Sequence, residues 1–284
     1  MFAPSRRTLL VSGLLATASI VAACRRRVPP TGVPHRIVTL GPNATEILFA
    51  LGVGDHVVGV SRYDDYPPAV ASLPRVGGLL DPSFEAIVAL RPDAVLGSRG
   101  PMNRAVLARL ESLGVRTLFP QVETLADIRA AITSVAAFVG VPERGRAVVA
   151  DLDEAIARQR ERSRTVDRPG VLAVFGQRPI VVAGPHSFAD ELITLGGGRN
   201  VVRDGPTWPM VSIETVVSLA PDIVLDLGQM EAGPSLADGW SERVAIPAVR
   251  NRRVVRINDP VVLRPGPRVA IAAQRYFDAI HPAR

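Results

Sequence analysis

Short apolar runs alternate with amphipathic segments along most of this chain. Residues 37–40 and 57–60 have the pattern of buried strands, and residues 45–51 between them have the apolar spacing of a helix. A longer helix is predicted over 125–139, and the same alternation begins again at residue 171. Alternating strands and helices are typical of α/β domains with mainly parallel sheets.

A fifteen-residue pattern occurs twice, at 83–97 and at 212–226, with eight identical positions. Each copy predicts a serine-capped helix, a Pro-Asp break and a buried strand. A repeat of this kind predicts two lobes of one design, which typically hold something between them. Each copy also places a glutamate, Glu85 or Glu214, in the first turn of its helix.

The N-terminus has the pattern of an export signal. Arg6 and Arg7 precede an apolar run that is too short to span a bilayer comfortably. The run ends in Val-Ala-Ala-Cys24, which is similar to the lipobox of bacterial lipoproteins, and Cys24 is the only cysteine. The resemblance implies cleavage before Cys24 and its acylation. A plain signal peptide with an incidental cysteine stays open, as does the choice between the twin-arginine and the general export route.

Between the two halves, residues 142–164 carry apolar side chains at helical spacing. They predict one connecting helix about 35 Å long, which permits small rocking of the lobes rather than wide closure. A surface helix followed by a flexible linker is the alternative. The predicted organisation is, in order, a signal peptide with lipobox (1–23), a lipidated tether (24–34), an N-terminal α/β lobe (35–141), the connecting helix (142–166) and a C-terminal α/β lobe (167–284).

The formal net charge of +6 comes mainly from the N-terminus. Residues 1–27 hold five arginines and no acid, whereas the rest of the chain has 28 arginines against 27 acidic residues. The body is therefore nearly neutral, and a basic stripe that follows a phosphate backbone is not supported. We expect no nucleic-acid partner.

The residues that carry enzymatic chemistry are poorly represented. The sequence has no Gly-x-Ser-x-Gly turn and no Cys/His cluster, and its four histidines lie far apart. With one cysteine, disulfides and thiol catalysis in the body are excluded. We predict no enzyme, no catalytic residue, no metal site and no cofactor. An exported hydrolase remains a remote alternative, because folding can assemble a triad from distant residues.

From about residue 35 to the C-terminus the chain resembles the periplasmic substrate-binding proteins of ABC importers for cobalamin, iron-siderophores and heme. The motifs that carry this resemblance follow the family's order and lie, besides the two repeats, at 36–46, 61–68, 208–214 and 264–268. The resemblance implies two α/β lobes joined by one long rigid helix. It also implies a monomer that binds a small molecule between the lobes and delivers it to a permease dimer.

Within this family, Tyr63 before Asp-Asp-Tyr-Pro-Pro and Trp208 before proline are most similar to the cobalamin receptors. The resemblance implies that Tyr63 and Trp208 line the cleft, one from each lobe, and that Asp259 makes a polar contact. Leu79 and Val181 stand where cobalamin receptors commonly have two further aromatic walls. Cobalamin or a related corrinoid is therefore the leading ligand.

Two other ligands of the same fold remain open. Heme would require an axial ligand, for which Tyr63 or Tyr66 could serve. A ferric siderophore would favour clustered arginines, with Arg62, Arg178 and Arg264 as candidates. Arg264, close to the last helix, is expected to meet either an anionic ligand or water.

The two repeat glutamates have two interpretations. An acid in the first turn of a helix is favoured by the helix dipole wherever helices occur. In the family that the chain resembles, one glutamate from each lobe docks onto arginines of the two permease subunits, which implies this role for Glu85 and Glu214. The expected location is periplasmic or at the cell surface, with Cys24 anchoring the protein to a membrane.

Overall fold

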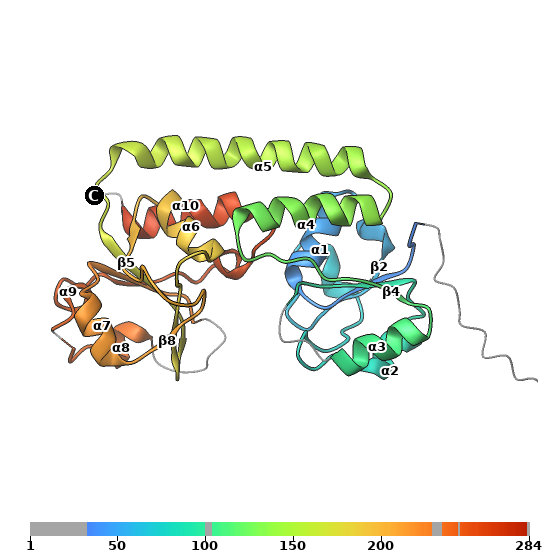
Figure 1. Ribbon diagram of the computed structural model, residues 1–284, viewed down its shortest axis with the longest axis horizontal. Helices are drawn as coiled ribbons and strands as arrows, with labels where there is room; N and C mark the ends of the chain where they lie inside the picture. Colours follow the sequence, from blue (N-terminus) through green and yellow to red (C-terminus); the bar gives the residue numbers. More distant parts are fainter. Residues whose placement is uncertain (1–32, 100–103, 229–234, 244, 283–284) are drawn as a thin grey trace, which may run out of the picture.

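The computed structural model describes residues 33–282 apart from 100–103, 229–234 and 244. The chain forms two α/β lobes, and one long helix runs across both (Figure 1). This confirms the predicted fold class. The predicted signal peptide and Cys24 lie outside the described residues. Within the described part of the chain, no helix is both long and apolar enough to cross a membrane.

The first lobe is built on a sheet of four parallel strands in the order β2-β1-β3-β4. Parallel neighbours need a crossover, so helices alternate with the strands and cover the sheet. The strands are β1 (Ile37–Thr39), β2 (Val57–Gly59), β3 (Ala94–Leu96) and β4 (Arg116–Leu118). The helices are α1 (Pro42–Ala50), α2 (Phe84–Ala89), α3 (Arg104–Ser112) and α4 (Leu125–Phe138), with 3-10 turns η1 (Gly54–His56) and η2 (Pro68–Ser72).

The second lobe contains a six-stranded mixed sheet. Its strands are β5 (Gly170–Gln177), β6 (Ile180–Val182), β7 (Arg199–Asn200), β8 (Met210–Val211), β9 (Ile223–Asp226) and β10 (Val254–Arg256). Strand β6 is antiparallel to β5, because the two-residue turn between them permits only a hairpin. It is also antiparallel to β8. The helices are α6 (Phe188–Leu195), α7 (Ile213–Leu219), α8 (Leu236–Gly239), α9 (Pro247–Arg250) and α10 (Val269–Ile280), with the turn η4 (Pro260–Leu263).

The two lobes share one topology. Strands β7, β5, β9 and β10 stand in the same parallel arrangement as β2, β1, β3 and β4. The repeats at 83–97 and 212–226 form α2 with β3 and α7 with β9, each beside the central strand of its lobe. Ser83 and Ser212 cap these helices, accepting bonds of 3.3 Å from the amides of Ala86 and Thr215. The repeat therefore marks equivalent elements of two similar lobes.

The connecting helix is α5 (Pro142–Arg162), which is followed by the 3-10 turn η3 (Ser163–Thr165). It packs against α4 of the first lobe and against α6 and α10 of the second. A side chain at Gly145 would lie 2.4 Å from the Cβ of Ala136, so glycine is what lets α5 approach α4 closely. Leu152 and Ile156 of α5 join an apolar core that is continuous from one lobe to the other.

Candidate functional site

A cavity of about 410 Å³ lies between the two lobes. Segments that follow the carboxyl ends of β1, β3 and β10 contribute to its wall, which is the usual place for ligands in α/β sheets. From the first lobe the lining residues are Leu40, Gly41, Pro42, Asn43, Tyr63, Asp65, Leu79 and Ser98. From the second lobe they are Pro260, Leu263, Arg264 and Pro265.

Tyr63 stands on a loop whose backbone is held from inside the lobe. The hydroxyl of Ser61 donates to the buried carboxylate of Asp64 and accepts from the amide of Tyr63 at 3.2 Å. Arg75 donates to the carbonyls of Ser61 and Asp64 at 3.0 and 2.8 Å. The Tyr63 ring packs against the backbone at Gly78 yet stays 45% exposed. A fixed backbone with an exposed ring is suited to ligand contact.

Burial raises the pKa of Asp64 above its ordinary value, against the opposing effects of the bond from Ser61 and the charge of Arg75. The carboxyl of Asp64 serves to hold the loop rather than to meet a ligand, because only 3% of the residue is exposed.

Four charged side chains form a network across the lobe boundary, and we call it the inter-lobe network. Glu46 of α1 and Asp65 come from the first lobe, whereas Arg264 and Arg268 precede α10 in the second. Arg268 binds Glu46 through two bonds of 2.9 and 2.6 Å. Arg264 binds both oxygens of Asp65 and also approaches Glu46 at 3.4 Å. Two acids and two arginines leave the network without net charge.

The network is well shielded from water on one side. The Glu46 side chain is 1% exposed, whereas that of Asp65 is 53% exposed. The guanidinium of Arg264 lowers the pKa of Asp65, partly opposed by burial, so this carboxylate is ionised at neutral pH. The guanidinium carbon of Arg268 lies 3.7 Å from the centre of the Tyr66 ring. Arg264 is thus paired with carboxylates of the opposite lobe, while its contact with an anionic ligand or water stays a prediction.

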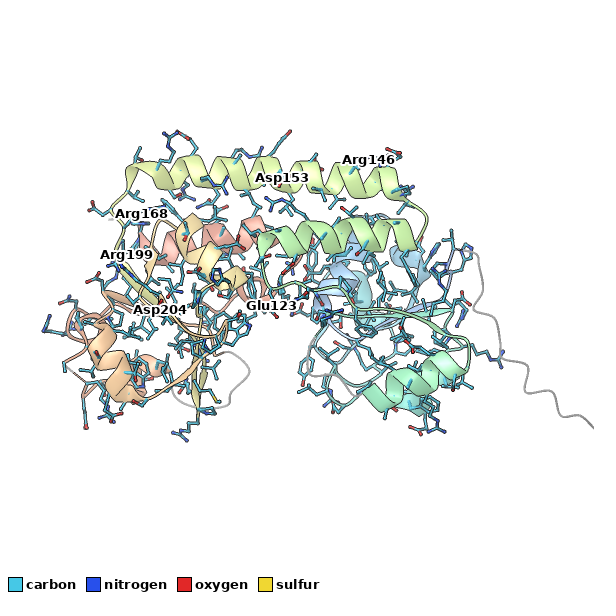
Figure 2. All side chains as sticks on the ribbon, viewed as in Figure 1. Glu123, Arg146, Asp153, Arg168, Arg199 and Asp204 are labelled. Atoms are coloured by element: carbon cyan, nitrogen blue, oxygen red, sulfur yellow. The ribbon has the colours of Figure 1, made fainter. Side chains whose placement is uncertain are left out.

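Trp208 is half-buried in the second lobe and is not among the residues that line the cavity. Its ring meets Phe175 edge-on at 4.9 Å between centroids and lies 5.7 Å from Phe188. Its indole nitrogen donates to the carboxylate of Glu123 at 2.9 Å. Glu123 lies just before α4, at the junction of the lobes (Figure 2). Trp208 therefore ties the second lobe to the first.

A second bond crosses the junction beside Trp208. The amide of Leu125, at the start of α4, donates to the Glu191 carboxylate of α6 at 2.6 Å. Together with the bond between Trp208 and Glu123, it fixes the start of α4 to the second lobe.

A Trp208→Phe substitution is expected to lower the free energy of unfolding by about 1.5 kcal/mol, because it deletes a hydrogen bond to a charged group while keeping an aromatic ring. Urea denaturation measures this, and Glu123→Gln, which retains an acceptor for the indole, is the matched control with a smaller expected loss. Weakened ligand binding without any loss of stability would instead favour the predicted role of Trp208 as a wall of the ligand site.

The remaining predicted ligand residues lie in different places. Leu79 lines the cavity with Tyr63 and Arg264. Val181 pairs with Met210 in the β6–β8 ladder and is not among the lining residues. Asp259 lies outside the cavity wall, where it caps η4 and accepts from Arg275 at 2.9 Å. Burial alone would raise the pKa of Asp259, but the bonds from Arg275 and the Val261 amide, with the charges of Arg275 and Arg268, together lower it. The structure brings together three of the predicted ligand residues, not all six.

Glu85 and Glu214 are both exposed, on α2 and α7 respectively. Both helices lie on the side of the molecule away from α5, one in each lobe (Figure 1). The bond from Ser212 lowers the pKa of Glu214, which keeps this carboxylate charged at neutral pH. The two glutamates thus belong to helices that lie on the same side of the two-lobed body.

The described residues contain no group of histidine, cysteine, aspartate and glutamate that could hold a metal ion. The fold does bring the rings of His35 and His56 to 4.9 Å, although 20 residues separate them in the chain. These rings lie outside the cavity wall.

Asp65, Glu46 and Glu123 were not singled out by the sequence analysis as functional residues. Glu46 carried one available signal, since it is an acid within the apolar run of α1 and such an acid needs a partner when it is buried. Asp65 and Glu123 lie in loops, where acids are common, and gave no comparable signal.

The pattern that defines the family described as periplasmic binding protein matches residues 37–261. The chain belongs to this family. Its members named below are binding proteins rather than enzymes, in agreement with the prediction that the chain is not an enzyme.

Three relatives illustrate the family. The vitamin B12-binding protein of Pectobacterium carotovorum is 28% identical over 246 residues, 86% of this chain and 87% of that protein. The apo periplasmic heme-binding protein of Roseiflexus sp. RS-1 is 32% identical, with a TM-score of 0.76 over 87% of this chain and 99% of that one. The periplasmic vitamin B12 binding protein of Vibrio cholerae is 28% identical, with a TM-score of 0.74 over 87% and 96%.

Proposed function

We propose that this protein captures cobalamin or a related corrinoid between its lobes and delivers it to an ABC importer. The observation that carries the proposal is the lining of the inter-lobe cavity. The described lining residues are apolar or neutral except Asp65 and Arg264, and these two neutralise each other. A corrin is a broad, largely uncharged macrocycle with amide side chains, so apolar walls with a few neutral polar groups suit it. The B12-binding relatives support this choice.

Heme is the second candidate. The ring of Tyr63 is exposed in the cavity wall, so its phenol oxygen is available to an iron atom, and several relatives of known structure are heme-binding proteins. A ferric siderophore has less support. Of its candidate arginines, Arg62 is paired with Asp81, Arg264 is paired with Asp65, and Arg178 is not among the residues that line the cavity.

Titration of the purified protein with cyanocobalamin, hemin and a ferric catecholate tests the ligand. Tryptophan emission and the visible spectrum of each ligand report binding. We expect saturable binding of cyanocobalamin, weakened about tenfold by Tyr63→Ala through the loss of an aromatic contact. Tyr66→Ala, which removes the other exposed tyrosine of the same loop, is the control. Saturable binding of hemin or the catecholate with none of cyanocobalamin would exclude the corrinoid.

The remaining parts of the proposal concern the location and the partner. Cleavage before Cys24 and acylation of this residue would hold the protein at a membrane surface, outside the cytoplasm. The mass of the exported protein tests this, because acylation adds the mass of the acyl chains. Glu85 and Glu214 would dock onto the two subunits of a permease dimer; both are exposed, and the helices that carry them lie on the same side of the molecule, which supports this role.

A further inference from the structure

The charge of the cavity wall depends on one ion pair. Among the described lining residues, Arg264 supplies the only positive charge and Asp65 the only negative one. Nη2 of Arg264 donates to Oδ2 of Asp65 at 2.8 Å, and Nη1 donates to Oδ1. This is the two-point geometry in which a guanidinium binds a carboxylate most strongly. While the pair is formed, neither charge is free to meet a ligand.

The other acceptors around Arg264 are weaker or already engaged. Glu46 lies 3.4 Å from Nη1, but both oxygens of Glu46 accept shorter bonds from Arg268. The carbonyl of Tyr63 lies 3.3 Å from Nη2. Asp65 is therefore the principal counterion of Arg264, and its removal would leave this arginine with spare donors at the cavity wall.

We propose that Asp65 is a specificity-determining residue, which excludes anionic macrocycles from the cleft by occupying Arg264. The inference rests on the proposed function, since it explains how a cleft of this fold selects an uncharged or zwitterionic ligand. A ligand carboxylate would have to displace Asp65 from Arg264. Because Asp65 belongs to the same chain, its effective concentration at Arg264 is high. The ligand carboxylate would also be repelled by the displaced acid, which stays beside it.

An Asp65→Asn substitution tests this with little change of shape. Asparagine keeps an oxygen acceptor but carries no charge. The net charge of the described lining residues therefore changes from zero to +1. The side chain of Asp65 is 53% exposed, and the fold is therefore expected to tolerate the change. Asp65→Ser is a second variant that removes the same charge with a smaller side chain.

The probes are hemin, which carries two carboxylates, and hemin dimethyl ester, which has the same macrocycle without them. We expect Asp65→Asn to bind hemin about tenfold more tightly than the wild type, with no comparable gain for the ester. The gain should shrink at high salt and disappear in Asp65→Asn/Arg264→Met. Glu143→Gln, which frees Arg146 in an exposed pair on α5 outside the cavity wall, is the matched control and should leave both affinities unchanged.

Equal affinity of the wild type and Asp65→Asn for hemin, including no binding to either, would overturn the inference, as would an equal gain for the ester. The outcome is separable from that of the proposed function, because cyanocobalamin binding is measured independently. A protein that fails to bind cyanocobalamin but shows the hemin gain would refute the ligand and retain the role of Asp65. Binding of cyanocobalamin without a gain in hemin affinity would support the proposed ligand and refute the role of Asp65.

Discussion

A Glu46→Ala substitution is expected to lower the free energy of unfolding by about 3 kcal/mol, because it leaves a half-buried arginine without a carboxylate. Arg268 donates both of its short ion-pair bonds to Glu46, and the Arg268 side chain is only 21% exposed. Arg264 still pairs with Asp65 in this variant, so it loses less of its electrostatic stabilisation. Because the network joins the lobes, we also expect weaker attachment of the segment before α10 to α1. Urea denaturation and the Tm measure the loss, which corresponds to roughly 10 °C.

Two further variants separate the charge effect from simple loss of packing. Glu143→Ala removes a carboxylate that pairs with Arg146 where both side chains are more than half exposed, and it should cost at most about 1 kcal/mol. Glu46→Leu combined with Arg268→Met replaces the buried pair by apolar groups and should recover much of the stability. A Glu46→Ala protein as stable as the Glu143→Ala protein would contradict the role assigned to the network.

Reversal of both docking charges, in Glu85→Arg/Glu214→Arg, is expected to reduce ligand transport by a reconstituted importer at least tenfold. Charge pairs across a protein interface contribute about 1.5 kcal/mol or more each, and reversal replaces attraction by repulsion. Both glutamates are exposed and form none of the ion pairs seen among the described residues, so ligand affinity should be unchanged, and folding should suffer only the small loss of an acid from the first turn of each helix. Uptake of labelled ligand into proteoliposomes measures transport, and titration of the free protein checks binding.

Asp151→Arg/Glu154→Arg is the matched control for this experiment. It reverses two exposed acids on α5, on the opposite side of the molecule (Figure 1), and should transport normally. Raising the salt concentration should weaken transport by the wild type, since exposed charges are screened. Wild-type transport by the Glu85→Arg/Glu214→Arg protein, with intact ligand binding, would refute the docking proposal.

Signals between neighbouring residues made the fold predictable from the sequence. The serine caps, the Pro-Asp breaks and the buried strands of the repeats at 83–97 and 212–226 all depend on neighbouring residues, and the structure has them where they were expected. The connecting helix follows the same rule, although it ends at Arg162, before the predicted boundary at 166. The antiparallel strand β6 was not foreseen, because a short apolar run does not reveal its direction.

The residues of the candidate site were harder to predict from the sequence. Tyr63 and Leu79 were assigned to the cavity through resemblance, and both line it. Trp208 was assigned in the same way, but the structure directs its indole to Glu123, which is 85 residues away in the chain. Arg264 was expected to meet an anionic ligand or water, and its pairing with Asp65, 199 residues away in the chain, was not foreseen. Partners this distant leave no local pattern, because their pairing depends on how the two lobes face each other.

The sequence by itself determined that the chain is an α/β protein with two related lobes, a long helix between them and a nearly neutral body. These properties follow from periodicity, capping and composition, which are local. The tertiary structure alone decided which charges face one another across the lobes, and so that the cleft carries a neutralised arginine instead of a free one. Charge pairing acts between side chains within a few ångströms, and only the assembled fold brings Glu46, Asp65, Arg264 and Arg268 that close.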